Sequence, residues 1–147
     1  MSDKVFRCAE CGTGQVKKMA KPGRKERYRT MVLEVPGEIE IPTCDHCGAE
    51  YLDKNAAITI DHALDEIYRK KLRTRAQRAI RLVTEHIPQG KLEELLGLSH
   101  GYLSKLRSGE KDPSTELVAH LALLARDPKS RIGELEQYWA RKDEDAA

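Results

Sequence analysis

The sequence predicts an α+β protein, with a small N-terminal β domain followed by a C-terminal all-α domain. The four cysteines lie within residues 8–47 and form two Cys-x-x-Cys pairs. Between the pairs, residues 27–34 are rich in β-branched and aromatic side chains, and residues 38–42 alternate polar and apolar, which is typical of strands. After residue 53, apolar side chains recur at the three- and four-residue spacing of helices.

Length and composition limit the range of functions. The 147 residues suffice for one mid-sized domain or two small ones. Charged residues make up 34% and aromatic residues 5%, which indicates a hydrophilic surface around a modest core. No apolar run approaches membrane-spanning length, and residues 1–7 lack the apolar core of a secretory signal. We therefore expect a cytoplasmic protein without a membrane partner.

The two cysteine pairs predict a metal site. Each pair places two thiolates on one tight turn, and two such pairs complete the tetrahedron of a structural Zn²⁺ site. Gly12 and Gly48 follow the pairs and allow the chain to turn back, so that backbone amides point at the sulfurs. His46 lies inside the second pair and is expected to be solvated or to support a ligand. The expected zinc ligands are Cys8, Cys11, Cys44 and Cys47.

Two other uses of the cysteines are less consistent with the pattern. A reducing cytosol disfavours disulfides. A redox Cys-x-x-Cys motif normally opens a helix in a βαβ pattern, and it would leave the second pair unexplained. An enzyme is not expected, because a zinc ion with four cysteine ligands has no position for water or substrate. About fifty residues bury little surface, so the metal must supply folding free energy.

A helical segment is expected to connect the two domains. Residues 53–72 place Ile60, Leu64 and Tyr68 on one face of a helix. Thr74 and Gln77 fit a capping box, which predicts that a second helix starts at residue 75 and runs to about residue 86. Pro88 would end that second helix.

Residues 89–113 predict a helix-turn-helix. From Leu92 to Pro113 the sequence reads L-x-x-L-L-G-L-S-x-x-x-L-S-x-L-x-x-G-x-x-x-P. Gly97 permits the tight turn, Ser99 is a suitable N-cap for the second helix, and Gly109 closes that helix. This pattern resembles the helix-turn-helix of the Cro/repressor (XRE) class, whose second helix enters the DNA major groove.

The resemblance implies which side chains contact DNA. It places base reading at the start of the second helix, where Lys105 could donate to guanine, and it places Gln89 beside a phosphate. Glu93 and Arg107 depart from the class, which usually has alanine and glutamate there, and a charge swap between them is conceivable. The candidate DNA-contacting residues are Gln89, Ser99, His100, Gly101, Ser104, Lys105, Ser108 and Lys111.

Two segments carry dense positive charge. Residues 17–29 hold seven basic side chains against Glu26, and residues 69–81 hold seven with no acid. The first is either a solvated hairpin tip or a phosphate-contacting loop, and the second is either a solvated helical face or a linker along a phosphate backbone. Both segments would also suit an alternative function, an RNA-binding or ribosome-associated zinc-ribbon protein. The few aromatic residues argue against single-stranded recognition.

The order of the two motifs resembles the MqsA family of antitoxins, with its YgiT-type zinc finger. The similarity covers residues 8–127 and includes the segment from Val35 to Leu52. It implies a homodimer that represses its own operon at a palindromic operator, and a zinc domain that binds a ribonuclease toxin. The expected division is a zinc finger at 1–52, a connecting helix at 53–73, the helix-turn-helix domain at 74–127, and a C-terminal helix with an acidic tail at 128–147.

The C-terminal helix carries the single tryptophan of the chain. Asp127 and Pro128 form an N-cap and N1 pair, and apolar residues continue at helical spacing to Tyr138 and Trp139. Trp139 either packs on its own domain or anchors a dimer. Both interpretations are open at the level of sequence.

Overall fold

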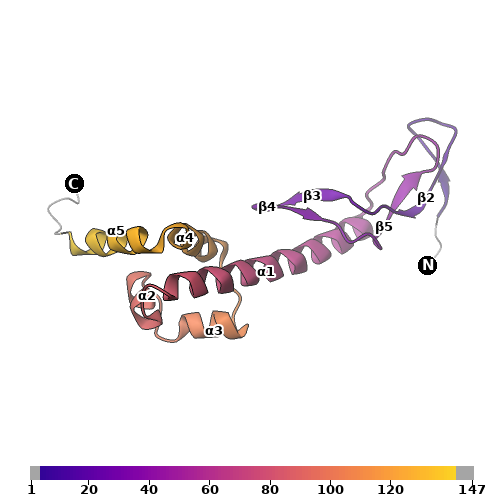
Figure 1. Ribbon diagram of the computed structural model, residues 1–147. Coiled ribbons are helices and arrows are strands. Elements are labelled where there is room, and N and C mark those ends of the chain that lie inside the picture. Colours follow the sequence, from indigo (N-terminus) through magenta and orange to yellow (C-terminus); the bar gives the residue numbers. More distant parts are fainter. Residues whose placement is uncertain (1–3, 142–147) are drawn as a thin grey trace. The chain divides into compact units, whose positions relative to one another are not determined.

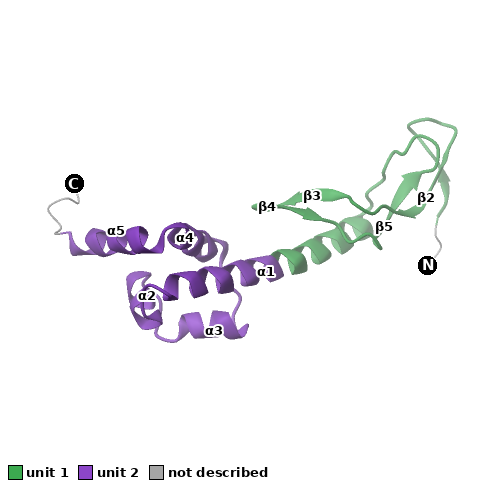
Figure 2. Ribbon diagram, in the orientation of Figure 1, with its two compact units in different colours: residues 1–68 green, residues 69–147 purple. Residues whose placement is uncertain are grey.

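The computed structural model describes residues 4–141 and has the α+β architecture that the sequence predicts. The chain divides into two compact units, residues 1–68 and residues 69–147 (Figures 1 and 2). Strands occur only in the first unit of the described chain, and the boundary falls inside helix α1, Lys54–Thr84. The acidic tail expected after residue 141 lies outside the described residues.

A three-stranded antiparallel sheet supports the cysteine region in the first unit. Its order is β1 (Phe6–Arg7), β2 (Gln15–Ala20) and β5 (Glu40–Cys44). The register pairs Val16 with Cys44, and both are buried together with Cys8. This register brings the end of β5 to the start of β2, so the two cysteine pairs meet at one end of these strands.

The segment between the sheet strands folds differently from the expectation. Residues 27–34 do not form one strand, because β3 (Lys25–Tyr28) and β4 (Met31–Glu34) make a separate hairpin. Arg29 lies in the left-handed region, with φ 49°, and forms the turn between β3 and β4. The β-branched residues around it do not indicate a turn. The basic residues Lys17 and Lys18 likewise lie in β2 and not in a hairpin tip.

Helix α1 is continuous, so the predicted break before residue 75 is wrong. Thr74 does not cap a new helix; its hydroxyl donates to the carbonyl oxygen of Lys70 at 3.0 Å, inside the helix. Residues 54–84 contain no glycine or proline, and the buried face continues through Leu72, Ala76 and Ile80. The capping box is a local preference, and this uninterrupted apolar stripe outweighs it.

Four shorter helices complete the second unit. They are α2 (Gln89–Leu95), α3 (Tyr102–Ser108), α4 (Thr115–Arg126) and α5 (Pro128–Ala140). The Ser114 hydroxyl caps α4 by accepting the Leu117 amide. Asp127 caps α5, with Pro128 in its first turn, as expected. The helices pack around Leu92, Leu103, Leu106 and Leu121, which are fully buried.

The start of α3 corrects one further expectation. Ser99 is not its N-cap, because the helix begins two residues later, after Gly101. Gly101 has φ 84°, a conformation that a side chain disfavours, and no side chain of its own segment caps the helix. The first turn of α3 therefore needs a partner from elsewhere in the unit.

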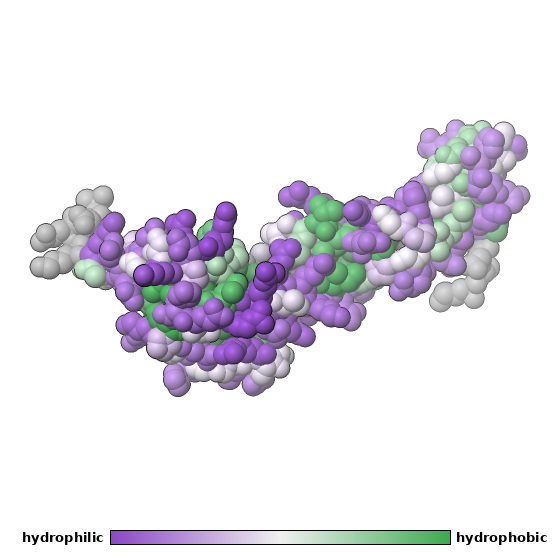
Figure 3. All heavy atoms as spheres, in the orientation of Figure 1, coloured by the Kyte–Doolittle hydropathy of each residue, from purple (hydrophilic) through white to green (hydrophobic). Residues whose placement is uncertain are grey.

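The face shown in Figure 3 is mostly hydrophilic, with apolar atoms gathered between α5 and α2 in the second unit. Leu123 on α4 and Tyr138 and Trp139 on α5 are each more than half exposed.

No helix within residues 4–141 combines the length and the apolar character needed to cross a membrane.

Candidate metal centre and nucleic-acid interface

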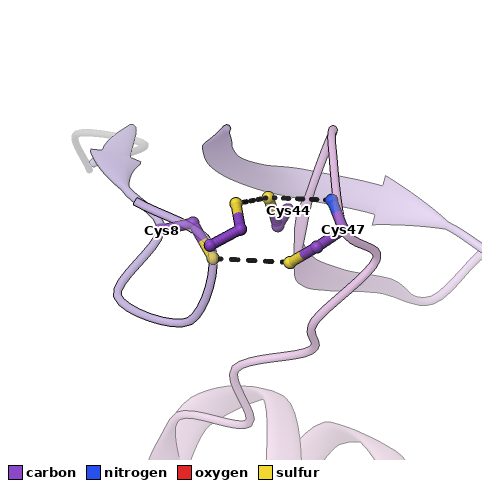
Figure 4. Close-up of side chains that lie close together, drawn as sticks. Cys8, Cys44 and Cys47 are labelled. Carbon is purple, nitrogen blue, oxygen red and sulfur yellow. Dashed lines mark hydrogen bonds between the residues drawn. The ribbon is translucent and has the colours of Figure 1, made fainter. Parts of the chain in front are cut away.

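The four cysteines converge at one point of the first unit. Their Sγ atoms all lie within 4.8 Å of one another, and all four are free thiols. Cys8 Sγ is 3.6 Å from Cys47 Sγ (Figure 4). Cys11 Sγ is 3.7 Å from Cys44 Sγ. These separations match the edges of a tetrahedron with a metal–sulfur distance of about 2.3 Å. Four thiolates in this arrangement can hold a metal ion.

Tight turns position each pair. Gly12 and Gly48 have φ of 66° and 75°, and their amides donate to the carbonyl oxygens of Cys8 and Cys44. Both turns follow the expectation from the sequence. Gly14 was not expected to matter, yet a Cβ there would lie 2.3 Å from Cys44 Sγ. A glycine is therefore required where β2 approaches the second pair.

Hydrogen bonds orient the sulfurs. The Gly14 amide donates to Cys11 Sγ at 3.3 Å, and the His46 amide donates to Cys44 Sγ at 3.4 Å. The His46 side chain is exposed and does not join the four sulfurs. Tyr51, four residues after the last cysteine, places its hydroxyl 3.2 Å from Cys8 Sγ. The regular spacing of the cysteines gives no signal for that contact, which depends on how the chain folds back.

The crowded thiols titrate unequally. The Tyr51 hydroxyl is the main cause of the lowered pKa of Cys8, and the Thr13 hydroxyl, with nearby amides, lowers the pKa of Cys11 to about 5. At Cys47 the Ala49 amide lowers the pKa, but loss of water around the sulfur and the neighbouring sulfurs raise it to about 12. Four sulfurs this close cannot all ionise without a cation, so the site favours a metal over free thiolates.

The basic segment at 17–29 is largely paired with acids of its own unit. Lys17 lies 3.4 Å from Asp45, and Lys21 lies 3.4 Å from Glu50. Arg24, with only 13% of its side chain exposed, also binds Glu50. These ion pairs reduce the charge that the segment could offer to a nucleic acid.

The predicted DNA-contacting residues gather around α2 and α3. His100 is 97% exposed just before α3, and Ser104, Lys105 and Ser108 are exposed on that helix. Lys111 lies after α3, with Nζ 5.3 Å from the centroid of the Tyr102 ring. Ser99 and Gly101 belong to the turn between the helices. The structure thus brings one row of exposed polar side chains together along a short helix.

Gln89 is occupied inside the protein. It is the first residue of α2, and its Nε2 donates to Ser104 Oγ at 2.7 Å. Its Oε1 accepts a hydrogen bond from Arg107 Nη1 at 3.1 Å. The charge swap that the sequence made conceivable is not formed, because Arg107 binds Gln89 and the Glu93 carboxylate accepts the Leu103 amide at 3.0 Å.

The second basic segment also makes contacts within its unit. On α1, Arg73 Nε donates to Asp112 at 3.1 Å, and Gln77 Nε2 donates to the carbonyl oxygen of Arg107 at 3.1 Å. Both contacts hold the end of α3 and the loop after it against α1. Part of the segment 69–81 thus positions α3 and the loop that follows it.

Trp139 contacts its own unit, and its role as a dimer anchor stays a prediction. Its indole Nε1 donates to the carbonyl oxygen of Leu95 at 2.9 Å, which ties α5 to α2. The side chain is nevertheless exposed, and it lines a groove of about 530 Å³ with Leu123, Leu135 and Tyr138. The tryptophan is therefore anchored on its own unit while its ring faces an open apolar groove.

Comparison with known proteins adds no assignment. The chain matches no protein-family model and no curated protein. Four clustered cysteines in a β unit followed by a helical unit are compatible with an MqsA-type arrangement at the level of architecture.

Proposed function

We propose that this protein is a sequence-specific DNA-binding transcriptional repressor with a structural zinc site. The observation that carries the proposal is the row of exposed side chains on α3, held against α2 by polar contacts. A helix of this kind fits the major groove, where its first residues reach the edges of the bases. Lys105 would donate to guanine, and His100 and Ser104 would contact neighbouring groups.

Zinc is the metal that suits the cysteine site best. Four thiolates in a tetrahedron are typical of structural Zn²⁺, and they leave no position for water or substrate. Cys8, Cys11, Cys44 and Cys47 would hold the ion, which supplies rigidity to a unit with a small core. Metal analysis of the protein as purified tests this assignment. One zinc per chain supports it, and iron or no metal contradicts it.

The functional form is proposed to be a homodimer. One helix-turn-helix reads a half-site, so a palindromic operator requires a twofold protein. The segment 89–114 has equal numbers of acidic and basic residues, so a single copy would attract DNA weakly. The groove beside Trp139 suits a second copy, because the exposed apolar side chains of Leu123, Tyr138 and Trp139 line it.

DNA binding across salt concentration is the decisive test. The zinc-loaded protein is titrated with the DNA upstream of its own gene and with a random duplex of equal length. We expect tight binding of a dimer to the upstream DNA and a cognate preference that Lys105→Ala reduces by about tenfold. Lys129→Ala is the matched control, since Lys129 is exposed on α5 and carries the same charge. Equal affinity for both duplexes contradicts the proposal.

The resemblance to MqsA-type proteins extends the proposal to an antitoxin that represses its own operon. The first unit would then bind a ribonuclease toxin. Co-purification of the product of the adjacent gene, and rescue of growth when both are expressed, test this part. A neighbouring gene without toxicity leaves the repressor and removes the antitoxin.

An RNA-binding protein is the alternative function. Its motivation is the basic character of residues 17–29 and 69–81. The ion pairs of Lys17, Lys21 and Arg24 make it the weaker proposal. RNA binding that survives Lys105→Ala and fails in a Lys18→Ala, Lys25→Ala double variant would favour it.

A further inference from the structure

Glu93 is the buried charge of the helix-turn-helix. Glu93 is 2% exposed, and it is the only buried charged residue within residues 4–141. Glu93 Oε2 accepts the backbone N–H of Leu103 at 3.0 Å. Glu93 Oε1 lies 3.9 Å from Nδ1 of the exposed His100. A carboxylate is costly to bury, so its contacts need a structural reason.

The first turn of α3 supplies that reason. Helices begin with amides that lack a partner inside the helix, and a side chain just before the helix usually accepts one of them. Gly101 occupies that place in α3 and has no side chain. The Leu103 amide is one of these amides, and Glu93 accepts it from the neighbouring helix. A carboxylate of α2 therefore performs the role of an N-cap for α3.

Glu93 acts beside a second contact of the same kind. Gln89 lies four residues earlier, on the same face of α2, and binds Ser104 and Arg107. Together the two residues join α2 to the beginning and to the outer face of α3. Gln89 is exposed to competition from water, whereas the Glu93 contact is buried. The buried bond is the stronger constraint on where α3 lies.

We propose that Glu93 is a positioning residue that sets the base-reading face of α3 and thereby determines sequence specificity. This inference rests on the proposed DNA-binding function. The hydrogen bond fixes the direction in which His100, Ser104 and Lys105 leave the helix. The negative charge has a second effect, because it repels the phosphates of every DNA sequence equally. Glu93 thus favours cognate DNA through geometry, whereas its charge lowers the affinity for all DNA and leaves the cognate-to-random ratio unchanged.

Three variants separate geometry from charge. Glu93→Ala removes both, and it should reduce the cognate-to-random affinity ratio by about tenfold or more. Glu93→Gln keeps an oxygen that can accept the Leu103 amide, so the ratio should stay within about threefold of the wild-type ratio. Glu94→Ala is the matched control, because Glu94 is exposed, is the next residue of α2 and pairs through its side chain with Lys91. Its ratio should not change.

The affinities are measured with the full-length, metal-loaded protein on upstream DNA and on a random duplex. An unchanged ratio in Glu93→Ala overturns the proposal. A Glu93→Gln variant as impaired as Glu93→Ala also overturns it, because the hydrogen bond would not be the cause. If Glu93→Ala fails to fold, Glu93→Asp replaces it, since a side chain one methylene shorter should lose the bond and reduce the ratio similarly.

Amide exchange in the free protein distinguishes this inference from the proposed function. Exchange at Leu103 should become about tenfold faster in Glu93→Ala, while Leu106, in the same helix, should change much less. Unchanged exchange at Leu103 overturns the role of Glu93 even if the wild-type protein prefers its own DNA. A wild-type protein without DNA preference overturns the proposed function instead, whatever the exchange rates are.

Discussion

The hydroxyl of Tyr51 lies 3.2 Å from Cys8 Sγ and accepts the backbone N–H of Ala9 at 3.1 Å. A thiolate can only accept a hydrogen bond, so the Tyr51 hydroxyl is the donor in this contact once the Cys8 thiol has lost its proton. The ring also packs edge to face against Phe6, with the centroids 5.4 Å apart. Tyr51 is therefore placed to donate to a metal-bound thiolate and to reduce the negative charge on it.

Replacing Tyr51 with phenylalanine should weaken the metal site without removing a ligand. The ring contact with Phe6 is retained, whereas the hydrogen bond to Cys8 is lost. We expect metal affinity to fall by about tenfold. In the Co²⁺-loaded protein, the sulfur-to-cobalt charge-transfer band should also shift, because the thiolate becomes a stronger donor. Chelator competition and the absorption spectrum measure the two effects.

Tyr28→Phe is the control for that variant. Tyr28 belongs to the same unit, and its hydroxyl donates to Asp65 at 2.9 Å, away from the sulfurs. Its cobalt spectrum should equal that of the wild type. Identical spectra for Tyr51→Phe and the wild type would show that the hydroxyl does not act on the thiolate.

The clustering of the four cysteines could be predicted from sequence, because Cys-x-x-Cys is a local pattern with one main use at this spacing. Tyr51 and Gly14 could not, because their contacts arise from the pairing of β2 with β5, in which Val16 opposes Cys44. The spacing of the cysteines does not indicate that register. Glycine is also common in turns and tyrosine in small cores, so neither residue type by itself indicates a contact with a sulfur.

The helices show the same division between local and tertiary signals. The spacing of apolar residues, with glycine and proline, predicts the two helices that the structure shows as α2 and α3. The capping rules failed at Thr74 and Ser99, where a suitable residue type is present but the surrounding structure uses it differently. Glu93 explains the second failure. Its side chain accepts the amide of Leu103, ten residues further along the chain, and so caps α3 in place of Ser99.

Removing the metal should unfold one unit and spare the other. The sheet packs on a small buried cluster that includes Cys8 and Cys44. Without a cation bound to the four sulfurs, the first unit would lose much of its stability. The second unit has its own core of leucine side chains and no cysteine. Addition of a strong chelator should abolish chemical-shift dispersion for residues 4–52 and preserve it for residues 89–140. Two-dimensional NMR follows both, and simultaneous loss in both units would contradict the prediction.

The pair of Arg24 and Glu50 should make the first unit sensitive to acid. Burial alone would raise the pKa of Glu50, but the hydrogen bond and the charge of Arg24 outweigh it and lower the pKa. A lowered folded-state pKa contributes stability above the unfolded pKa, and this contribution is lost as the pH falls through the folded pKa. Glu50→Gln should cost about 2 kcal/mol at neutral pH, and the difference from the wild type should shrink below about pH 4.5.

Unfolding in denaturant at a series of pH values measures that difference. Glu38→Gln is the control, since Glu38 is exposed in the same unit and carries the same charge. The metal content is measured at each pH, and the three proteins are compared only at pH values at which all of them keep the metal. A difference for Glu50→Gln that stays constant from neutral to acidic pH would contradict the role of ionised Glu50.

The apolar groove of the second unit should determine the oligomeric state. Leu123 is 57% exposed on α4 and lines the groove with Tyr138 and Trp139. Leu123→Glu would place a carboxylate in the contact with a second copy, and burying it there without a partner is unfavourable. We expect the dimer dissociation constant to rise by about tenfold or more, together with a loss of binding to the full palindrome but not to a half-site. Sedimentation equilibrium measures the first effect and DNA titration the second.

Val32→Glu is the matched control, because Val32 is 63% exposed on β4 and lies outside the groove. A Leu123→Glu protein that dimerises like Val32→Glu would exclude this groove as the contact between copies, and the palindrome would then have to be read through a different interface.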